Sequence, residues 1–521
     1  MKNLLLSLLF LAFTQFIFAQ AEPPKDWFHL DQKENNYQGV SAYKAYKELL
    51  KGKKAKTIIV AVLDSGVDFK HEDLKDIIWT NPGEIPDNGI DDDHNGYIDD
   101  IHGWSFIGGK NGNVDHEQLE ITRLYKHYRD QFKETKPESL SRKQKKEYQR
   151  YLTIKKEFDK ALDDAKTNLK RFEDLLDALT ALQKAYGKDE FTAKDLPEMK
   201  TKNPAAGQIV AMLKRGGSAK DLRKRLEGAY DYYAKNVSYY YNPDFDARKI
   251  VGDDYANSYE KYYGNKDCMG PDPSHGTHVA GIIAAVRNNG IGMDGIADNV
   301  KIMSVRAVPD GDERDKDVAN GIIYAVDNGA KIINMSFGKP YSWDKTAVDK
   351  AVKYAVKHGV LLVHAAMNDS KNVDENIVFP NDRYDKKGLF RPRYAKSWLD
   401  VGALSWKKGE DAIATFSNYG KKNVDVFAPG VAIYSTTPDN TYSSYNGTSM
   451  ATPVTAGIAA VLMGYFDLSA KQVKKIIMQS TVPLTQKVKK TDTHALAPMT
   501  DLCRTGGVVN LYNAVKLAMK K

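Results

Sequence analysis

TIIVAVLDSGVD, residues 57–68, opens with a continuous apolar and mostly β-branched run and then becomes polar. Such a run is typical of a parallel strand that is buried on both faces. Asp64 is the last residue of that strand, and open α/β sheets place their active sites at the carboxyl ends of their strands. The segment therefore predicts an α/β fold with a functional carboxylate at Asp64.

Two later segments place a reactive side chain at the start of a predicted helix. SHGTHVAG, residues 274–281, puts His275 in the first turn of a buried helix. GTSMATP, residues 447–453, puts Ser449 before a second buried helix over 451–463, with Pro453 expected in the first turn, where proline is tolerated. We expect the Ser449 hydroxyl to lie near the partial positive charge of that helix N-terminus.

Asp64, His275 and Ser449 are together the three groups that hydrolysis by a nucleophilic serine requires. A hydroxyl needs a histidine to take its proton, and the histidine needs a carboxylate to orient it and stabilise its charge. Each residue alone has an ordinary explanation as a cap or turn residue, but chance explains poorly why all three stand at the right ends of such elements. His278 lies one helical turn after His275 and is expected to pack or hydrogen-bond locally.

With the order Asp, His, Ser and the GTSMATP motif, the chain resembles the subtilase family over roughly 22–115 and 242–521. The resemblance implies a subtilisin-like serine endopeptidase that cleaves peptide or protein substrates. It also implies an oxyanion hole formed by Asn368 and the Ser449 amide. Two alternatives stay open: a non-catalytic binding protein, which a degraded triad would favour, and an aminopeptidase-like enzyme, which an insertion over one end of the cleft would favour.

The same resemblance marks residues for substrate binding. It implies contacts from Ser336, Phe337, Gly338, Ala365, Ala366 and Met367. The first three match a family segment that pairs with the substrate as a β-strand, with an apolar preference at Phe337. The last three would shape the primary specificity pocket, where Met367 replaces a usual glycine. Lys339 replaces another glycine at the rim of this segment.

Beyond residue 275, predicted strands over 300–308, 331–337, 360–366, 399–404 and 424–428 alternate with helices over 318–328 and 347–358. Such alternation predicts a doubly wound, mostly parallel sheet covered on both faces. The expected fold is therefore α/β and subtilisin-like, with an inserted α-helical subdomain. The expected divisions are a signal peptide over 1–21, catalytic-domain segments over 22–114 and 242–521, and the helical insertion over 115–241.

The insertion carries apolar residues at alternating spacings of four and three, which is a heptad pattern. These residues are Phe158, Leu162, Ala165, Leu169, Phe172, Leu176 and Leu179. A helical hairpin that packs its own stripe is the main interpretation, and Pro137, Pro197, Pro204 and the glycines at 216–217 divide the block into three or four helices. Because the insertion follows the strand that ends at Asp64, we expect it to border the active-site cleft and restrict access to it.

Residues 91–100, DDDHNGYIDD, resemble the opening of a calcium loop, with oxygen ligands at alternate positions and glycine at the sixth. The ligands predicted for a structural Ca²⁺ are Asp91, Asp93, Asn95, Tyr97 and Asp99. The usual glutamate at the twelfth position is absent, because His102 stands there. We therefore expect Asp99 or Asp100 to close the site, and the alternative is a polar turn without a cation.

The remaining signals concern location and partners. Lys2 followed by an apolar stretch over 4–19 and a small-residue cleavage pattern predicts a secretory signal, and hence a secreted or periplasmic protein whose N-terminal prodomain is absent or vestigial. No second stretch is long enough to span a membrane. A net charge of +8, from 76 basic and 68 acidic residues without a compact basic motif, gives no reason to expect nucleic-acid binding. Cys268 and Cys503 could form a disulfide, which we favour slightly, and the oligomeric state stays open.

Overall fold

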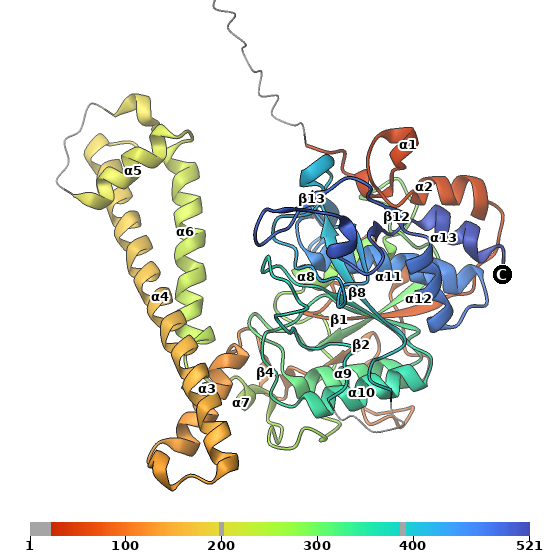
Figure 1. Ribbon diagram of the computed structural model, residues 1–521, viewed down its shortest axis with the longest axis horizontal. Helices are drawn as coiled ribbons and strands as arrows, with labels where there is room; N and C mark the ends of the chain where they lie inside the picture. The colour runs from red at the N-terminus through yellow and green to blue at the C-terminus, as the bar shows by residue number, and fades with distance from the viewer. Residues whose placement is uncertain (1–21, 197–202, 386–391) are drawn as a thin grey trace, which may run out of the picture.

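The computed structural model describes residues 22–196, 203–385 and 392–521, and a nine-stranded sheet forms its centre (Figure 1). The signal peptide expected over 1–21 lies outside the described residues. Every pairing in the sheet is parallel except that of the edge strand β12 with β15. In spatial order the strands span Val482–Pro483 (β12), Gly507–Val508 (β15), Val426–Pro429 (β9), Trp398–Leu404 (β8), Leu361–Ala365 (β7), Ile332–Met335 (β6), Ile58–Asp64 (β1), Val300–Arg306 (β5) and Gly103–Ser105 (β2).

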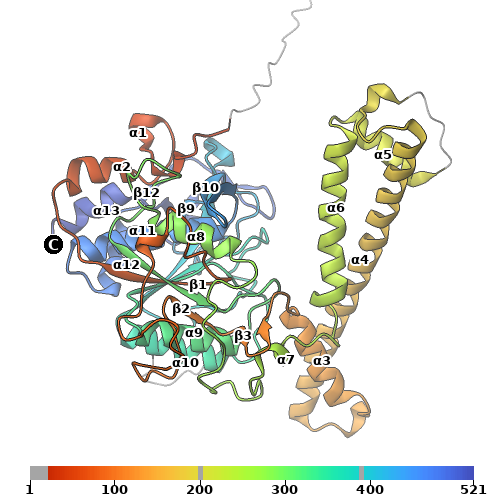
Figure 2. The same cartoon turned by 180° about the vertical axis from the view of Figure 1, so that it is seen from behind.

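Strand β1 lies inside the sheet and contributes to a core on each face. Val60 and Val62 belong to a core shared with α8, α11, α12 and α13, whereas Ala61 and Leu63 belong to a core shared with α9 and α10. The two groups of helices lie on opposite faces of the sheet (Figures 1 and 2). Their bounds are Ser274–Ala284 (α8), Asp315–Asp327 (α9), Lys345–Lys357 (α10), Thr448–Tyr465 (α11), Ala470–Gln479 (α12) and Leu511–Ala518 (α13). The doubly wound α/β architecture predicted from the sequence is confirmed.

Shorter elements complete the catalytic domain. They are the helices Gln32–Asn35 (α1), Ala42–Ala45 (α2) and Arg248–Val251 (α7), and the strand pairs Gly108–Gly109 (β3) with Gly112–Asn113 (β4), Ile433–Thr437 (β10) with Thr441–Tyr445 (β11), and Val488–Lys489 (β13) with Leu496–Ala497 (β14). Among the described residues, no helix is both long and apolar enough to cross a membrane.

The insertion forms an elongated arm beside the catalytic domain (Figures 1 and 2). Its helices are Glu120–Phe132 (α3), Arg142–Tyr186 (α4), Pro204–Lys214 (α5) and Ala219–Lys235 (α6). Local signals set the ends of the longest helix: Ser141 and Gln144 form a capping box, and Gly187 takes a left-handed conformation with φ 63°. In the described chain, four α-helices thus occupy the block that prolines and glycines were predicted to divide.

Helices α4 and α6 pack together along the arm and bury part of the predicted stripe. Phe158, Ala165 and Leu179 are buried, whereas the other four stripe residues are half-buried. The outer part of the arm has a core of its own, formed by Leu175, Ala178, Leu179 and Leu182 of α4 with Ile209 and Leu213 of α5 and Leu222 and Leu226 of α6. The expected self-packing hairpin is therefore present.

The two cysteines do not form the disulfide that we favoured. Cys268 and Cys503 are both free thiols, and both are buried. Burial raises the pKa of the Cys268 thiol to about 12. A thiol that stays protonated is a poor nucleophile, so Cys268 behaves as a small apolar core residue.

We predict that Leu179→Ala loosens the arm and leaves the catalytic domain intact. A buried Leu→Ala change costs about 2–5 kcal/mol, and this side chain belongs to the arm's own core. Hydrogen exchange should become faster in α4 and α6 and stay unchanged in β1 and β6. Lys170→Ala, an exposed change on the same helix, is the control. Equal loss of protection in the sheet would show that the arm and the catalytic domain unfold as one unit.

Candidate active site

Asp64 and His275 meet at the carboxyl end of β1. The Asp64 Oδ1 atom lies 2.7 Å from His275 Nδ1 and also accepts a 2.8 Å hydrogen bond from the Ser65 amide. Asp64 is 1% exposed, whereas the His275 side chain, in the first turn of α8, is 39% exposed. With its Nδ1 proton donated to Asp64, His275 presents the lone pair of Nε2 as a base. His278 Nε2 donates a 3.0 Å hydrogen bond to the Ser443 carbonyl, so this histidine has the expected structural role.

The surroundings of His275 shift its basicity. Partial removal of the ring from water is the largest single influence and lowers the pKa of His275, but the charge and hydrogen bond of Asp64, with the charge of Asp272, outweigh it. The resulting pKa lies above the ordinary value of 6.5. An imidazole with a raised pKa is a stronger base at the pH where it is still neutral.

Ser449 lies in the first turn of α11. All the remaining residues of that helix from Thr448 to Gly464 are buried. Pro453 lies inside the helix, not in its first turn as we predicted. Because proline has no N–H, it cannot donate to the carbonyl of Ser449 four residues earlier. The Ser336 hydroxyl donates a 3.0 Å hydrogen bond to this carbonyl instead. The missing N–H of Pro453 therefore allows a bond between the main chain of Ser449 and the residue that follows β6.

The Ser449 hydroxyl donates a 3.0 Å hydrogen bond to the Ser336 carbonyl. Within the described residues it makes no hydrogen bond to His275. Catalytic hydrogen bonds are often long or misaligned without substrate, and rotation about the Cα–Cβ bond redirects this hydroxyl. All three predicted triad residues thus lie at the same edge of the sheet.

Asn368 follows β7 and faces the start of α11. Its Oδ1 accepts hydrogen bonds from the Thr448 amide at 2.9 Å and the Thr448 hydroxyl at 3.0 Å. These bonds fix the orientation of the side-chain amide and leave its Nδ2 donors free for another acceptor. Met367, just before it, has a φ of 76°, a conformation that glycine adopts readily and other residues seldom do.

The predicted substrate-binding residues differ in what they offer a substrate: some have buried side chains, and some have unpaired main-chain groups. Ala365, Ala366 and the Phe337 side chain are buried, so the Phe337 ring packs in the core and does not line an open pocket. Within the described residues, however, no hydrogen bond engages the main chain of Phe337 or Gly338. A Cβ placed on Gly338 would lie 3.0 Å from the Met367 sulfur, so Met367 borders this segment.

Lys339 corrects one expectation. It was predicted at the rim of the substrate segment, but its side chain is only 1% exposed. Its ammonium pairs with Glu120 and Asp315 at 2.6 and 2.8 Å. This pairing could not be predicted from the sequence, because Glu120 belongs to the insertion, far away in the chain.

A cavity of about 410 Å³ opens beside the triad and is lined by Asp64, His275 and Ser336. Asp115 and Lys235, from the two ends of the insertion, also line it, as does Asp310. The Asp310 amide donates to the Asp115 carbonyl at 2.8 Å, and its carboxylate lies 2.7 Å from Lys235 Nζ. Both ends of the insertion therefore meet at one wall of the cavity.

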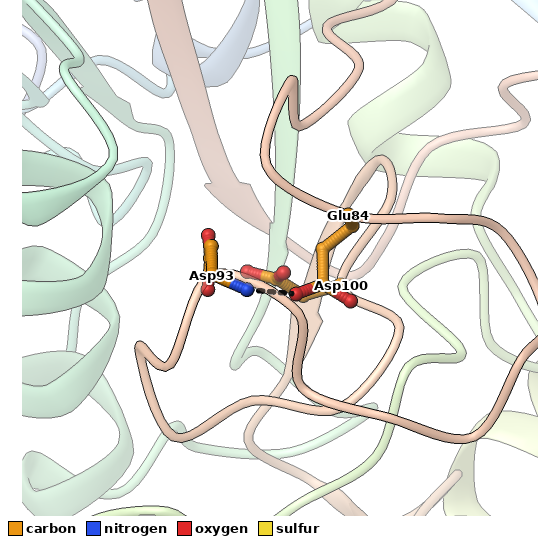
Figure 3. Close-up of side chains that lie close together, drawn as sticks. All are labelled: Glu84, Asp93 and Asp100. Atoms are coloured by element: carbon orange, nitrogen blue, oxygen red, sulfur yellow. Dashed lines mark hydrogen bonds between the residues drawn. The ribbon is translucent and has the colours of Figure 1, made fainter.

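An acidic cluster lies near the predicted calcium loop but has a different composition. Glu84, Asp93 and Asp100 each place a carboxylate oxygen within 4.8 Å of the others (Figure 3). Glu84 and Asp100 are buried, and Glu84 accepts hydrogen bonds from the Asp92 and Asp93 amides at 3.0 and 3.2 Å. Only Asp93 belongs to the predicted ligand set, and Asp100 is one of the two residues expected to close the site.

The other predicted ligands serve local structure. Both carboxylate oxygens of Asp91 accept main-chain amides of the turn, and those of Asp99 accept the Asn88 and Gly89 amides and the Lys266 ammonium. The Tyr97 ring is buried among other aromatic rings. Asn95 donates from its amide to Asp93 and Asp100, and so lies beside the cluster. Glu84 was missed because it precedes the alternating motif.

The cluster has the character of a cation site. Burial raises the pKa of Asp100 to about 6, against the opposing hydrogen bonds from Tyr324, Asn81 and Asn95, and the charge of Asp93 adds to the rise. Among the described residues, no Lys, Arg or His pairs with any of the three carboxylates. Three acidic groups without a positive partner, all offering oxygen ligands, fit a hard divalent cation.

Comparison with known proteins agrees with this geometry. The model of the subtilase family of peptidases matches residues 55–498. The chain belongs to the subtilase family. Subtilisin DY of Bacillus licheniformis is 37% identical over 238 residues, which are 45% of this chain and 78% of that protein. Thermitase of Thermoactinomyces vulgaris is 34% identical over 277 residues, which are 53% of this chain and 84% of that protein.

A thermophilic serine proteinase of a Bacillus species (strain AK1) is 40% identical over 225 residues. That match covers 43% of this chain and about half, 49%, of the relative. The subtilase described here is thus a serine-type endopeptidase of a known family that carries an additional helical arm.

We predict that Asp64→Asn moves the acid limb of the pH profile of this subtilase to lower pH. The base works only when neutral, so activity rises as His275 loses its proton, and the raised pKa places that rise above pH 6.5 in the unaltered enzyme. Asparagine removes the charge that raises the pKa. The rate of inactivation by a fluorophosphonate, followed from pH 5 to 9, measures the midpoint. Asp159→Asn on the arm is the matched control, and an unchanged midpoint in Asp64→Asn would contradict the assignment.

Proposed function

We propose that this subtilase is a secreted or periplasmic endopeptidase in which Ser449 is the nucleophile, His275 the general base and acid, and Asp64 the group that orients His275. The observation that carries these roles is the 2.7 Å contact between the buried Asp64 carboxylate and His275 Nδ1, at the edge of the sheet where α11 presents Ser449. The apolar leader over 1–21 supports the location outside the cytoplasm.

In the first step, the Ser449 oxygen attacks the carbonyl carbon of the scissile bond while His275 Nε2 takes the hydroxyl proton. Asp64 stabilises the imidazolium through Nδ1 and stays ionised. The tetrahedral intermediate then expels the amine, which receives the proton from Nε2. In the second half, water attacks the acyl-enzyme with the same proton transfers and releases the acid.

Charge that develops on the carbonyl oxygen needs donors that are already in place. Asn368 is suited to this role because its Oδ1 is held by Thr448, which leaves Nδ2 as a donor. The Ser449 amide at the start of α11 is the second donor, and the helix N-terminus adds partial positive charge. Loss of one such donor costs about 100-fold to 1,000-fold in turnover in subtilisin, a member of the same family.

The substrate is an extended segment of a peptide or protein. The free main-chain groups of Phe337 and Gly338 favour pairing with it as an additional strand. Ala366 and Met367 border the position of the scissile residue, and the left-handed Met367 directs its side chain toward Gly338. We expect Met367 to narrow the specificity pocket relative to a glycine at this position.

We predict that Ser449→Ala abolishes labelling by a fluorophosphonate and lowers peptide turnover by several orders of magnitude. The reason is that the Ser449 hydroxyl lies in the first turn of α11, next to Thr448, which holds Asn368, and at the sheet edge where Asp64 orients His275. Gel fluorescence and hydrolysis of a chromogenic peptide measure the two effects. The control is Ser469→Ala, at the cap of α12. Labelling that persists in Ser449→Ala would place the nucleophile elsewhere.

We also propose that Glu84, Asp93 and Asp100 hold a structural Ca²⁺. Among the described residues, the hydrogen-bond partners of these three carboxylates are neutral, and oxygen ligands suit this ion. When bound, the ion would neutralise the cluster and join the loop around Glu84 to the one that ends at Asp100. Its role is stability, and the hydrolytic steps do not involve it.

We predict that a chelator lowers the unfolding temperature and that Ca²⁺ restores it, because a ligand at about 100 times its Kd adds about 2.7 kcal/mol to stability. Glu84→Gln combined with Asp100→Asn should remove the response, as measured by thermal unfolding with and without Ca²⁺. Asp91→Asn, which alters a neighbouring carboxylate outside the cluster, should retain it. If the effect of Ca²⁺ on the unfolding temperature were lost in Asp91→Asn and kept in the double variant, the ion would bind the 91–100 loop predicted from the sequence.

A further inference from the structure

Lys339 comes directly after the substrate segment Ser336–Gly338 and is fixed at both its main chain and its side chain. Its amide donates to the Phe379 carbonyl and its carbonyl accepts from the Phe379 amide, both at 2.9 Å. Its ammonium donates to Glu120 Oε2 at 2.6 Å, to the Glu313 carbonyl at 2.5 Å and lies 2.8 Å from Asp315 Oδ1. Three acceptors match the three donors of an ammonium group, so its position is fully determined.

Because the Lys339 ammonium is buried, it cannot leave its charged partners without a large cost in free energy. An ammonium inside a protein is tolerated only when charges and hydrogen bonds replace its hydration, and Glu120 and Asp315 are themselves nearly inaccessible. If the side chain moved, the buried Asp315 carboxylate would lose its cation, and Glu120 would keep only Arg123. The segment that ends at Lys339 therefore has a single low-energy position.

The arm supplies one of the two carboxylates that hold the Lys339 ammonium. Glu120 is the first residue of α3, and its amide donates to Asp312 Oδ2 at 2.7 Å. Arg123, one turn later, holds both Glu120 oxygens at 3.2 and 2.8 Å and also donates to the Asp312 and Glu313 carbonyls. The base of the insertion is thus built into the same buried network as the substrate segment.

Ser336 fixes the other end of the segment. Its hydroxyl donates to the Ser449 carbonyl and its own carbonyl accepts from the Ser449 hydroxyl, each at 3.0 Å. Phe337 and Gly338 lie between these two fixed residues, and in the part of the chain described here their main-chain groups are unpaired. A short span held at both ends keeps its N–H and C=O groups in one orientation.

We propose that Lys339 is a positioning residue that holds the main chain of Phe337 and Gly338 in register for an extended substrate, and that Glu120 at the base of the arm is its anchor. The proposal rests on the proposed strand pairing of substrate with this segment. It assigns α3 a function of its own within the insertion: through Glu120, α3 supports substrate binding.

The test compares two substrates of the full-length enzyme: a tetrapeptide anilide and the single-residue anilide that shares its scissile residue. Only the tetrapeptide can pair with residues 337–338. Lys339→Met should lower the ratio of the two kcat/KM values by about tenfold, mainly through a higher KM, because one or two hydrogen bonds to substrate are lost. The rate of fluorophosphonate labelling, which needs the triad but no extended chain, should stay within about twofold.

Lys155→Met is the matched control, since this lysine pairs with Asp159 on the exposed face of α4. It should leave both the ratio and the labelling unchanged, and Lys339→Arg should restore part of the ratio. An unchanged ratio in Lys339→Met would overturn the proposal. So would a parallel fall of labelling and of both hydrolysis rates, which would mean that Lys339 only supports the fold.

Glu120→Gln covers the case in which Lys339→Met does not fold. Glutamine keeps the shape and one acceptor oxygen, so the ratio should fall severalfold while labelling persists, and no fall would again overturn the proposal. Failure of the proposed catalytic function itself would look different, because the unaltered enzyme would then not be labelled at Ser449.

Discussion

The active site depends on a carboxylate that is almost completely removed from water. An ion in such a position needs donors that replace its hydration, and Asp64 Oδ1 accepts hydrogen bonds from both the His275 ring and the Ser65 amide. That requirement fixes the first turn of α8 against the end of β1. Since β1 lies between β5 and β6 with both faces in a core, the carboxylate cannot shift to meet its partner. The sheet therefore sets the geometry of the triad.

The best-predicted features follow from periodicity and from position within an element. The apolar run that ends at Asp64 determines both a buried strand and the edge at which its last residue lies. Likewise, the heptad spacing around Phe158 and Leu179 is enough to predict a helix that packs against a partner. His275 and Ser449 were placed correctly because each begins a helix whose apolar sequence requires burial.

The features that were missed depend on contacts between distant segments. Nothing local in the sequence distinguishes Lys339 from a surface lysine, and only the fold brings Glu120 to it. Glu84 similarly joins a cluster whose motif begins after it. Pro453 was misplaced because the helix starts earlier than expected, and its missing N–H has meaning only once Ser336 is seen beside the Ser449 carbonyl. Such pairings need three-dimensional information.

The length of α4 has a mechanical consequence. From Phe158, where the helix meets the aromatic residues of the base, to its end at Tyr186, the helix extends about 42 Å at 1.5 Å per residue. A continuous helix of this kind transmits displacement as a stiff lever, so a rotation of about 10° at the base would carry the tip through roughly 7 Å. The same lever works in reverse, because a load at the tip exerts its greatest torque at the base, on α3. The first residue of α3, Glu120, holds Lys339 next to the substrate segment.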